Sequence, residues 1–293
     1  MGWVKRLRVL AGVTALALAV AACSIVTDKP QSGPTIITPG SRATTPEPGA
    51  TKAPGKNGTQ ASPGQTNPGK VPPPLRYDDD GSVGTMSRVF LRRSPARALS
   101  IEFAYVSGRT PQGSAIAHLT SILRRELDKP DGITTTVGNS ISSSKTSWTL
   151  DDLRALERAS RSRHSGGSRA TMWFAYVGGR YAENPNALAV TFSASASVIF
   201  RDRIDDAATS VVLEQGIERS VLVHEAGHML ALVEIGYRSR FDHSDAQHPY
   251  HSNNPDSVMY WAVEDISVRN ILAGGPPDDF DDADRADLAQ LRG

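Results

Sequence analysis

The segment His224-Glu225-Ala226-Gly227-His228 carries the side chains best suited to chemistry in this 293-residue chain. Ile217, Val221 and Leu232 recur around it at helical spacing, which predicts a helix with both histidines on its buried side. Residues four apart on a helix differ by about 40° in direction, so both imidazoles can bind one metal ion. Zinc lowers the pKa of bound water to about 7, and Glu225 is placed to accept the proton. The pattern predicts a zinc ion with Glu225 as general base, and later as acid toward the leaving amine.

A zinc ion of this kind needs a third protein ligand, and the sequence offers several candidates. Glu234 lies ten residues after His224, but on a helix that continues past it the side chain points about 240° away from the direction of His228. His243, His248 and His251 follow in a polar stretch. His243 and His248 have an alternative role as residues of a solvated loop, and residue types alone leave the third ligand open.

The helix resembles the metzincin superfamily of zinc peptidases, whose pattern is H-E-x-x-H-x-x-G-x-x-H followed by a methionine-containing turn. The first five positions match, whereas Ala231 and Glu234 stand where the family has glycine and the third histidine. The family's glycine ends the helix in a backbone conformation that costs other residues energy. Ala231 therefore predicts that the helix runs on to about Gly236.

The later segment from His251 to Tyr260 resembles matrixin-like and archaemetzincin-like members between the third ligand and the methionine turn. His251 lies eight residues before Met259, and Ser252 and Ser257 stand where archaemetzincins typically have cysteines. The resemblance implies that His251 is the third ligand, displaced by an insertion of about 17 residues. It also implies that Met259 supports the metal site from below; the alternative is an ordinary core methionine.

The elements before this helix alternate between strand and helix patterns. Strands are expected over 99–106, 133–141 and 170–177, and helices over 114–127 and from Thr149, capped with Asp152, to about His164. Alternation over 188–200 predicts a single strand with one wet face. This order indicates an α/β or α+β arrangement. The resemblance implies a metzincin-like domain over 84–293 with a mixed twisted sheet, an active-site helix and a Met-turn.

The C-terminal stretch 276–291 resembles the closing helix of matrixin-like domains. Four acidic residues lie near its start, where they favour the positive end of the helix dipole: Asp278, Asp279, Asp281 and Asp282. Calcium is a second candidate cation at these acids, although the calcium-loop pattern with its central glycine is absent.

The N-terminal residues 1–22 have the pattern of an export signal, since basic residues precede an apolar run too short to span a bilayer. The run ends in Val20-Ala21-Ala22-Cys23, which resembles the lipobox of bacterial lipoproteins and implies a lipid on Cys23; the alternative is an ordinary signal. Cys23 is the only cysteine, so no internal disulfide forms. Residues 23–83 are expected to be the lipidated cysteine and a disordered tether rich in Pro, Gly, Thr and Ser.

Taken together, these features predict a zinc-dependent peptidase, most simply an endopeptidase, held by the lipid on Cys23 at the outer face of the cytoplasmic membrane. The resemblance implies that its peptide or protein substrate lies along an edge strand, the one ending at Phe200. The formal charge of +1 gives no reason to expect nucleic acid as a partner. The alternative function is a non-catalytic envelope lipoprotein whose domain binds a partner.

Overall fold

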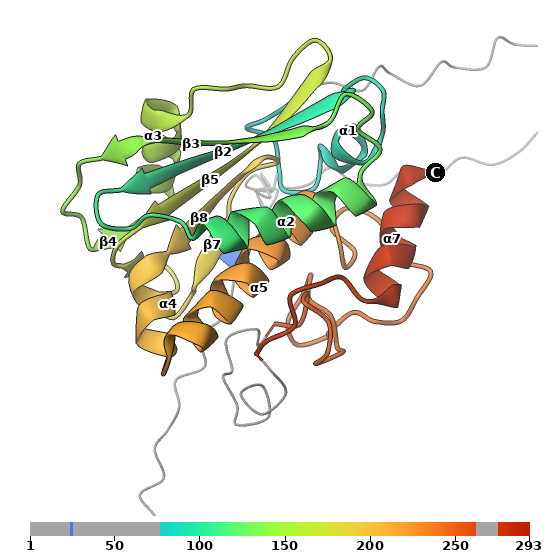
Figure 1. Cartoon of the computed structure of the whole chain (residues 1–293). Coiled ribbons are helices and arrows are strands. Elements are labelled where there is room, and N and C mark those ends of the chain that lie inside the picture. The colour runs from blue at the N-terminus through green and yellow to red at the C-terminus, as the bar shows by residue number, and fades with distance from the viewer. Residues whose placement is uncertain (1–23, 26–76, 262–274) are drawn as a thin grey trace, which may run out of the picture. The chain divides into compact units, whose positions relative to one another are not determined.

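The computed structural model describes residues 24–25, 77–261 and 275–293, and its centre is a six-stranded mixed sheet (Figure 1). The strand order is β1-β7-β8-β5-β2-β3. The strands are β1 Ser24–Ile25, β2 Ala98–Val106, β3 Ile133–Ile141, β5 Arg169–Val177, β7 Ala189–Thr191 and β8 Ala196–Phe200. Strands β8, β5, β2 and β3 run parallel, whereas β7 is antiparallel to β8 and parallel to β1. The predicted mixed sheet is confirmed.

The predicted signal, Cys23 and most of the predicted tether lie outside the described residues.

Helices cover both faces of this sheet because its strands alternate between two apolar faces. On β5, Met172, Phe174 and Tyr176 pack in one cluster with α2 (Gly113–Glu126) and α5 (Val211–Met229). Trp173 and Val177 pack in a second cluster with α3 (Leu150–Ser160). Strands buried on both faces are apolar almost throughout, as expected for parallel sheets. The remaining elements are α1 Ser87–Leu91, α4 Arg201–Ala207, α7 Asp282–Arg292 and the two-stranded pair of β4 Ser147–Trp148 with β6 Arg180–Tyr181.

The start of α3 confirms a local prediction. The Thr149 hydroxyl accepts a hydrogen bond from the Asp152 N–H, and the Asp152 carboxylate accepts one from the Thr149 N–H, 2.9 Å away. This reciprocal pair satisfies two N–H groups that a helix start leaves open. The helix ends at Ser160, four residues before the predicted end near His164.

The prediction of a single half-wet strand over 188–200 is wrong. The segment forms two antiparallel strands, β7 and β8, and all of its residues are buried. Ala194, in the turn between them, donates its N–H to the Gly81 carbonyl 2.7 Å away. Alternation of apolar and polar side chains continues through the turn, so it did not reveal the change of direction. The polar set is buried because it meets α5 and the N-terminal segment of the domain.

The prediction that α5 continues to Gly236 is also wrong. The helix ends at Met229, and Ala231 adopts a φ of 66°. The Ala231 N–H bonds to the His228 carbonyl, and the Leu232 N–H bonds to the Gly227 carbonyl, both at 3.0 Å. This is the Schellman arrangement, in which a left-handed residue satisfies the last carbonyls of a helix. Alanine here occupies the position that usually takes glycine, at a cost of about 1–2 kcal/mol.

Residues 77–83, assigned to the tether from the sequence, belong to the folded domain. The Asp79 carboxylate lies 3.2 Å from the buried guanidinium of Arg161, which also pairs with Glu157 at 2.6 Å. Val83 is part of the main apolar cluster. The low hydrophobicity of the stretch before position 84 concealed this segment, because it is held mainly by polar contacts.

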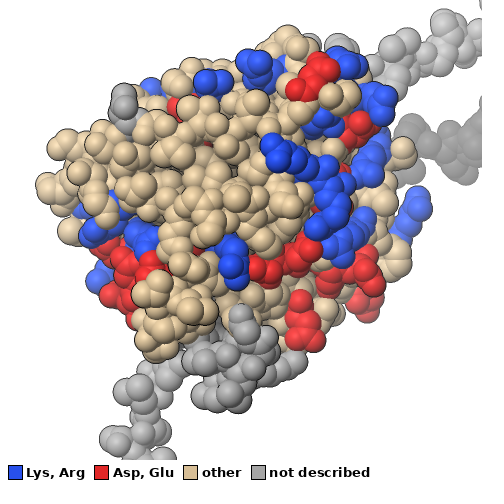
Figure 2. Space-filling view, viewed as in Figure 1, with Lys and Arg blue, Asp and Glu red and all other residues tan. Residues whose placement is uncertain are grey.

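Ion pairs fasten the C-terminal segment to the helices beside it. Arg125 at the end of α2 pairs with Asp279 at 2.5 Å, Arg219 on α5 pairs with Asp278 at 2.9 Å, and Arg285 on α7 pairs with Glu126 at 3.2 Å. Figure 2 shows basic and acidic side chains side by side at this part of the surface. Asp281 caps α7 rather than lying within it. Calcium at these acids stays a prediction.

None of the helices within the described ranges has the length and apolar character needed to cross a membrane.

Candidate metal centre

Three histidines meet beneath β7 and β8, two from α5 and one from the loop that follows it. His224, His228 and His251 are each at most 6 % exposed, and one ring nitrogen of each lies within 4.8 Å of the others. Their ring centroids are 4.5 to 5.3 Å apart. The sequence predicted these three residues, and the structure brings all three together.

The protein orients two of these rings through backbone carbonyls. His224 Nδ1 lies 2.7 Å from the Val258 oxygen and His251 Nδ1 lies 3.0 Å from the Pro249 oxygen. A carbonyl oxygen only accepts, so each Nδ1 carries the proton and each Nε2 keeps its lone pair. Such hydrogen bonds typically fix the tautomer and direction of histidines that ligate metals.

The remaining ring nitrogens form an unpaired set. His224 Nε2, His251 Nε2 and both nitrogens of His228 are buried and have no hydrogen-bond partner among the described residues. A buried polar group left unpaired costs about 1–3 kcal/mol, so packing alone does not favour four such atoms in one place. The set fits zinc, which takes neutral imidazole nitrogens, and the three side chains leave a fourth position for water or substrate.

Burial keeps these imidazoles neutral. It lowers the pKa of His224 to about 3 and that of His251 to about 4, and it holds the pKa of His228 well below its usual value. Mutual repulsion among the three rings lowers the pKa values of His224 and His228 further. Neutral imidazole is the form that binds a metal ion, so the site needs no proton loss near neutral pH.

Met259 supports the centre from the loop side. A Cβ added at Gly227, between the two histidines of α5, would lie 2.3 Å from Met259 Sδ. The absence of a side chain at Gly227 therefore lets the methionine turn pack directly against the helix. The turn is held by Ser252, whose N–H donates to the Met259 carbonyl at 2.8 Å. Met259 is fully buried beside the helix, and its role beneath a metal ion stays a prediction.

Glu225 lies fully buried between α5 and the strands above it. Its Oε2 accepts a short hydrogen bond from the Thr191 hydroxyl on β7 and a 3.3 Å bond from the Ser197 hydroxyl on β8. The sequence analysis did not identify these two hydroxyl groups, because it placed them on a wet face. The sequence did offer one sign of them: both are hydroxyl residues in the strand segment that comes shortly before the helix of His224 and His228.

The other candidate ligands lie elsewhere. Glu234 accepts a hydrogen bond from the Ser239 N–H at 3.1 Å. His243 Nε2 lies 2.9 Å from the Asp287 carboxylate, and His248 Nδ1 lies 2.9 Å from the Asp245 carboxylate. Each therefore has a structural partner, and none belongs to the cluster of three.

The expected substrate edge is also different from the prediction. β8, which ends at Phe200, lies inside the sheet between β7 and β5. β7 lies beside β8 on the side away from β5. Its other side pairs with β1, in the register Ser24 to Val190 and Ile25 to Thr191. The edge-strand prediction failed because the hairpin at 192–195 was not foreseen.

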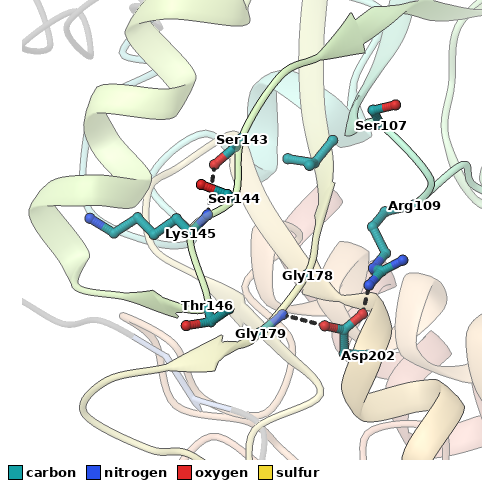
Figure 3. Close-up of a pocket in the computed structure, with 10 residues that line it drawn as sticks. Ser107, Arg109, Ser143, Ser144, Lys145, Thr146, Gly178, Gly179 and Asp202 are labelled. Carbon is teal, nitrogen blue, oxygen red and sulfur yellow. Dashed lines mark hydrogen bonds and ion pairs between the residues drawn. The ribbon is translucent and has the colours of Figure 1, made fainter.

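A separate hollow of about 400 Å³ opens at the carboxyl ends of β2 and β5 (Figure 3). Asp202 lies between Arg109, with which it forms an ion pair, and the Gly179 N–H, 2.7 Å away. Gly179 has a φ of 78°, and a Cβ there would lie 2.2 Å from the Thr146 carbonyl oxygen. The charges of Arg109 and Asp202 are thus paired within the protein. None of the three clustered histidines lines this hollow.

Comparisons with known proteins give matches among solved structures. No family model and no curated protein matches the chain. Archaemetzincin from Methanopyrus kandleri is 13% identical with a TM-score of 0.44, over 67% of this chain and 97% of that one. Metalloproteinase-II from Bacteroides fragilis is also 13% identical, with a TM-score of 0.40, over 78% of this chain and 59% of that one. The function is therefore argued from the geometry of the three histidines and Glu225.

Proposed function

We propose that this protein is a zinc-dependent peptidase, as the resemblance of its sequence to the metzincins implies. One observation carries the proposal: three buried histidines direct unpaired nitrogens to one place, beside a buried glutamate on the same helix. His224, His228 and His251 would hold the metal. When bound, zinc supplies Lewis acidity that polarises a carbonyl and makes water acidic near neutral pH.

Glu225 is the proposed general base. It is adjacent to a ligand in sequence, and its direction on the helix differs from that of His224 by about 100°. The carboxylate can therefore lie beside the metal position without entering the ligand set. It would take a proton from the attacking water and return it to the leaving amine. The hydroxyl groups of Thr191 and Ser197 hold the carboxylate on its sheet side.

The proposed substrate is an extended peptide added along β7, where main-chain groups supply the hydrogen bonds and side-chain pockets give selectivity. Ser24–Ile25 pairs with this strand. A substrate strand on the same side of β7 would have to replace β1.

The test is cleavage of denatured casein by the purified full chain and by Glu225→Gln. The variant is expected to keep about one zinc per chain and to lose at least about 100-fold in rate, because proton transfer is removed while the ligands remain. Cleavage at an unchanged rate would overturn the mechanism. Zinc without any cleavage by the unsubstituted protein would favour the non-catalytic binding alternative.

We further propose that a lipid on Cys23 anchors the protein at the outer face of the cytoplasmic membrane. The lipobox resemblance supports this location. Membrane fractionation tests it: Cys23→Ser is expected to move the protein out of the membrane fraction, and an unchanged distribution would contradict the anchor.

A further inference from the structure

The catalytic carboxylate of the proposed peptidase is held by a matched pair of hydroxyl groups on the sheet above it. Thr191 and Ser197 are directly opposite each other in the antiparallel pairing of β7 with β8. Residues opposite each other across two strands share one face of the sheet. Both hydroxyl groups therefore point toward α5 and lie within hydrogen-bond distance of the same oxygen, Glu225 Oε2; the single Ser197 hydroxyl hydrogen is shared between this oxygen and the Val190 carbonyl.

Burial makes this contact consequential. Thr191, Ser197 and Glu225 are each 0 % exposed. A carboxylate removed from water is strongly disfavoured unless hydrogen bonds replace its hydration. The two hydroxyl groups also restrict rotation of the carboxylate, because a rotation about the Cγ–Cδ bond would break both bonds at once.

Each hydroxyl also has a backbone carbonyl within reach as a second acceptor. The Ser197 hydroxyl lies 3.1 Å from the Val190 carbonyl, and the Thr191 hydroxyl lies 3.4 Å from the Glu225 carbonyl oxygen. The neighbouring side chains on the same face, Ala189 and Ile199, pack in the apolar cluster with α5. The hairpin thus presents a rigid polar pair within an otherwise apolar contact.

We propose that Thr191 and Ser197 are positioning residues that set the direction of the Glu225 carboxylate toward the metal position. This inference rests on the proposed function of Glu225 as base. It assigns to the β7–β8 hairpin a role in the rate of the reaction that is separate from any contact with substrate. Groups that orient catalytic or metal-binding side chains typically contribute about 10–100-fold to activity.

The test compares Thr191→Val, which keeps the shape but removes the hydroxyl, with Thr191→Ser, which keeps the hydroxyl. Thr171→Val is the matched control, because Thr171 is an equally buried threonine on β5 whose hydroxyl has no partner among the described residues. Thr191→Val is expected to lower kcat by about 10–100-fold with KM and zinc content unchanged. Thr191→Ser should recover most of the rate, and Thr171→Val should show no loss.

A second readout does not depend on activity. In metal-free protein, Thr191→Val is expected to lower the urea midpoint more than Thr171→Val does, since it leaves a buried carboxylate short of a donor. This excess should shrink in the Glu225→Gln background. Equal kcat and equal urea midpoints for the two valine variants would overturn the inference. If the unsubstituted protein cleaves no peptide, the proposed function fails, and the urea comparison alone decides whether the hydroxyl groups hold the carboxylate.

Discussion

Four histidines of the described residues are buried, and the surroundings of the three clustered ones are opposite to those of His243. His224, His228 and His251 face one another with unpaired nitrogens and with no carboxylate partner among the described residues, and their pKa values are lowered. His243 is equally buried, but Asp287 accepts from it at 2.9 Å, and this hydrogen bond raises its pKa. Burial alone therefore does not distinguish a candidate ligand from a structural histidine; the carboxylate partner of His243 does.

Backbone strain also distinguishes the three clustered histidines from His243. Ala231, three residues after His228, and Tyr250, directly before His251, both have φ near 70°. Strain of this kind persists only where the surrounding structure imposes it, and it often accompanies functional sites. His243 has no such residue beside it. The proposed metal centre thus combines unpaired polar atoms with strained backbone, whereas His243 has a carboxylate partner on its Nε2 and no left-handed residue beside it.

The largest expected effect is on zinc content, which should distinguish the clustered histidines from His243 and His248. His228→Ala and His251→Ala are each expected to weaken zinc binding by about 1000-fold or more, because a site with two protein ligands holds zinc poorly. His243→Ala and His248→Ala should retain about one zinc per chain. Elemental analysis after dialysis against a weak chelator measures this. Zinc lost equally from all four variants would break the comparison.

In the metal-free protein, substitution of His243 should cost more stability than substitution of a clustered histidine, the reverse of their effects on zinc binding. His243→Leu is expected to lower the free energy of unfolding by about 3 kcal/mol, since it leaves Asp287 buried without its cationic partner. His228→Leu should leave it unchanged or raise it, because it removes a buried ring whose two nitrogens have no hydrogen-bond partner among the described residues. Urea unfolding of both variants measures the difference, and a larger loss for His228→Leu would contradict this assignment.

The pH dependence of these two stabilities has opposite signs. The pKa of His243 is raised above 6.5 and that of Asp287 is lowered below 3.8, so their pair stabilises fully between these values and loses its effect as pH rises. The penalty of His243→Leu should therefore shrink toward pH 9. The pKa of His228 is lowered, so the unfolded chain binds its proton first as pH falls below 6.5. His228→Leu should consequently become more favourable, relative to the unsubstituted protein, as pH falls below 6.5.

The smallest effect expected is at the end of α5. Ala231→Gly should raise the free energy of unfolding by about 0.5–1 kcal/mol, because glycine adopts a φ of 66° without the steric cost that alanine bears. Ala226→Gly is the matched control: it makes the same chemical change within the helix and should lower stability by about 1 kcal/mol or more. Destabilisation by both changes would show that the Ala231 methyl group contributes more through packing than it costs in strain.

The sequence predicted best where the signal is local. The capping box of Thr149, the bounds of β3 and the common direction of His224 and His228 each depend on residues a few positions apart. The end of α5 was harder to predict because the turn there packs against Gly84, which lies far away in sequence. A Cβ at Gly84 would lie 2.9 Å from that of Ala231, so the glycine lets this segment pack against the turn.

The Glu225 environment shows the same limit. Thr191 and Ser197 alternate with apolar residues as solvent-facing side chains do, and only the hairpin brings them opposite each other above α5. His251 was predicted from its spacing to Met259 and not from its distance to His228. The spacing to Met259 is the more informative of the two because the Ser252–Met259 hydrogen bond holds the third histidine from its C-terminal side.

The hydrogen bond between Ser252 and Met259 bears on how much the loop between His228 and His251 can vary in length. His251 is held from both sides: the Ser252 N–H donates to the Met259 carbonyl, and in the preceding loop the Pro249 carbonyl accepts from His251 Nδ1 at 3.0 Å and the Asp245 N–H donates to the His251 carbonyl at 2.8 Å. Residues can therefore be added or removed without moving the ring only in the part of the loop before Asp245. Each doubling of a flexible loop costs only about 0.6 kcal/mol. A search for related proteins that fixes the distance between the second and third histidines would miss chains of this kind. A search that fixes seven residues between the third histidine and the methionine would retain them.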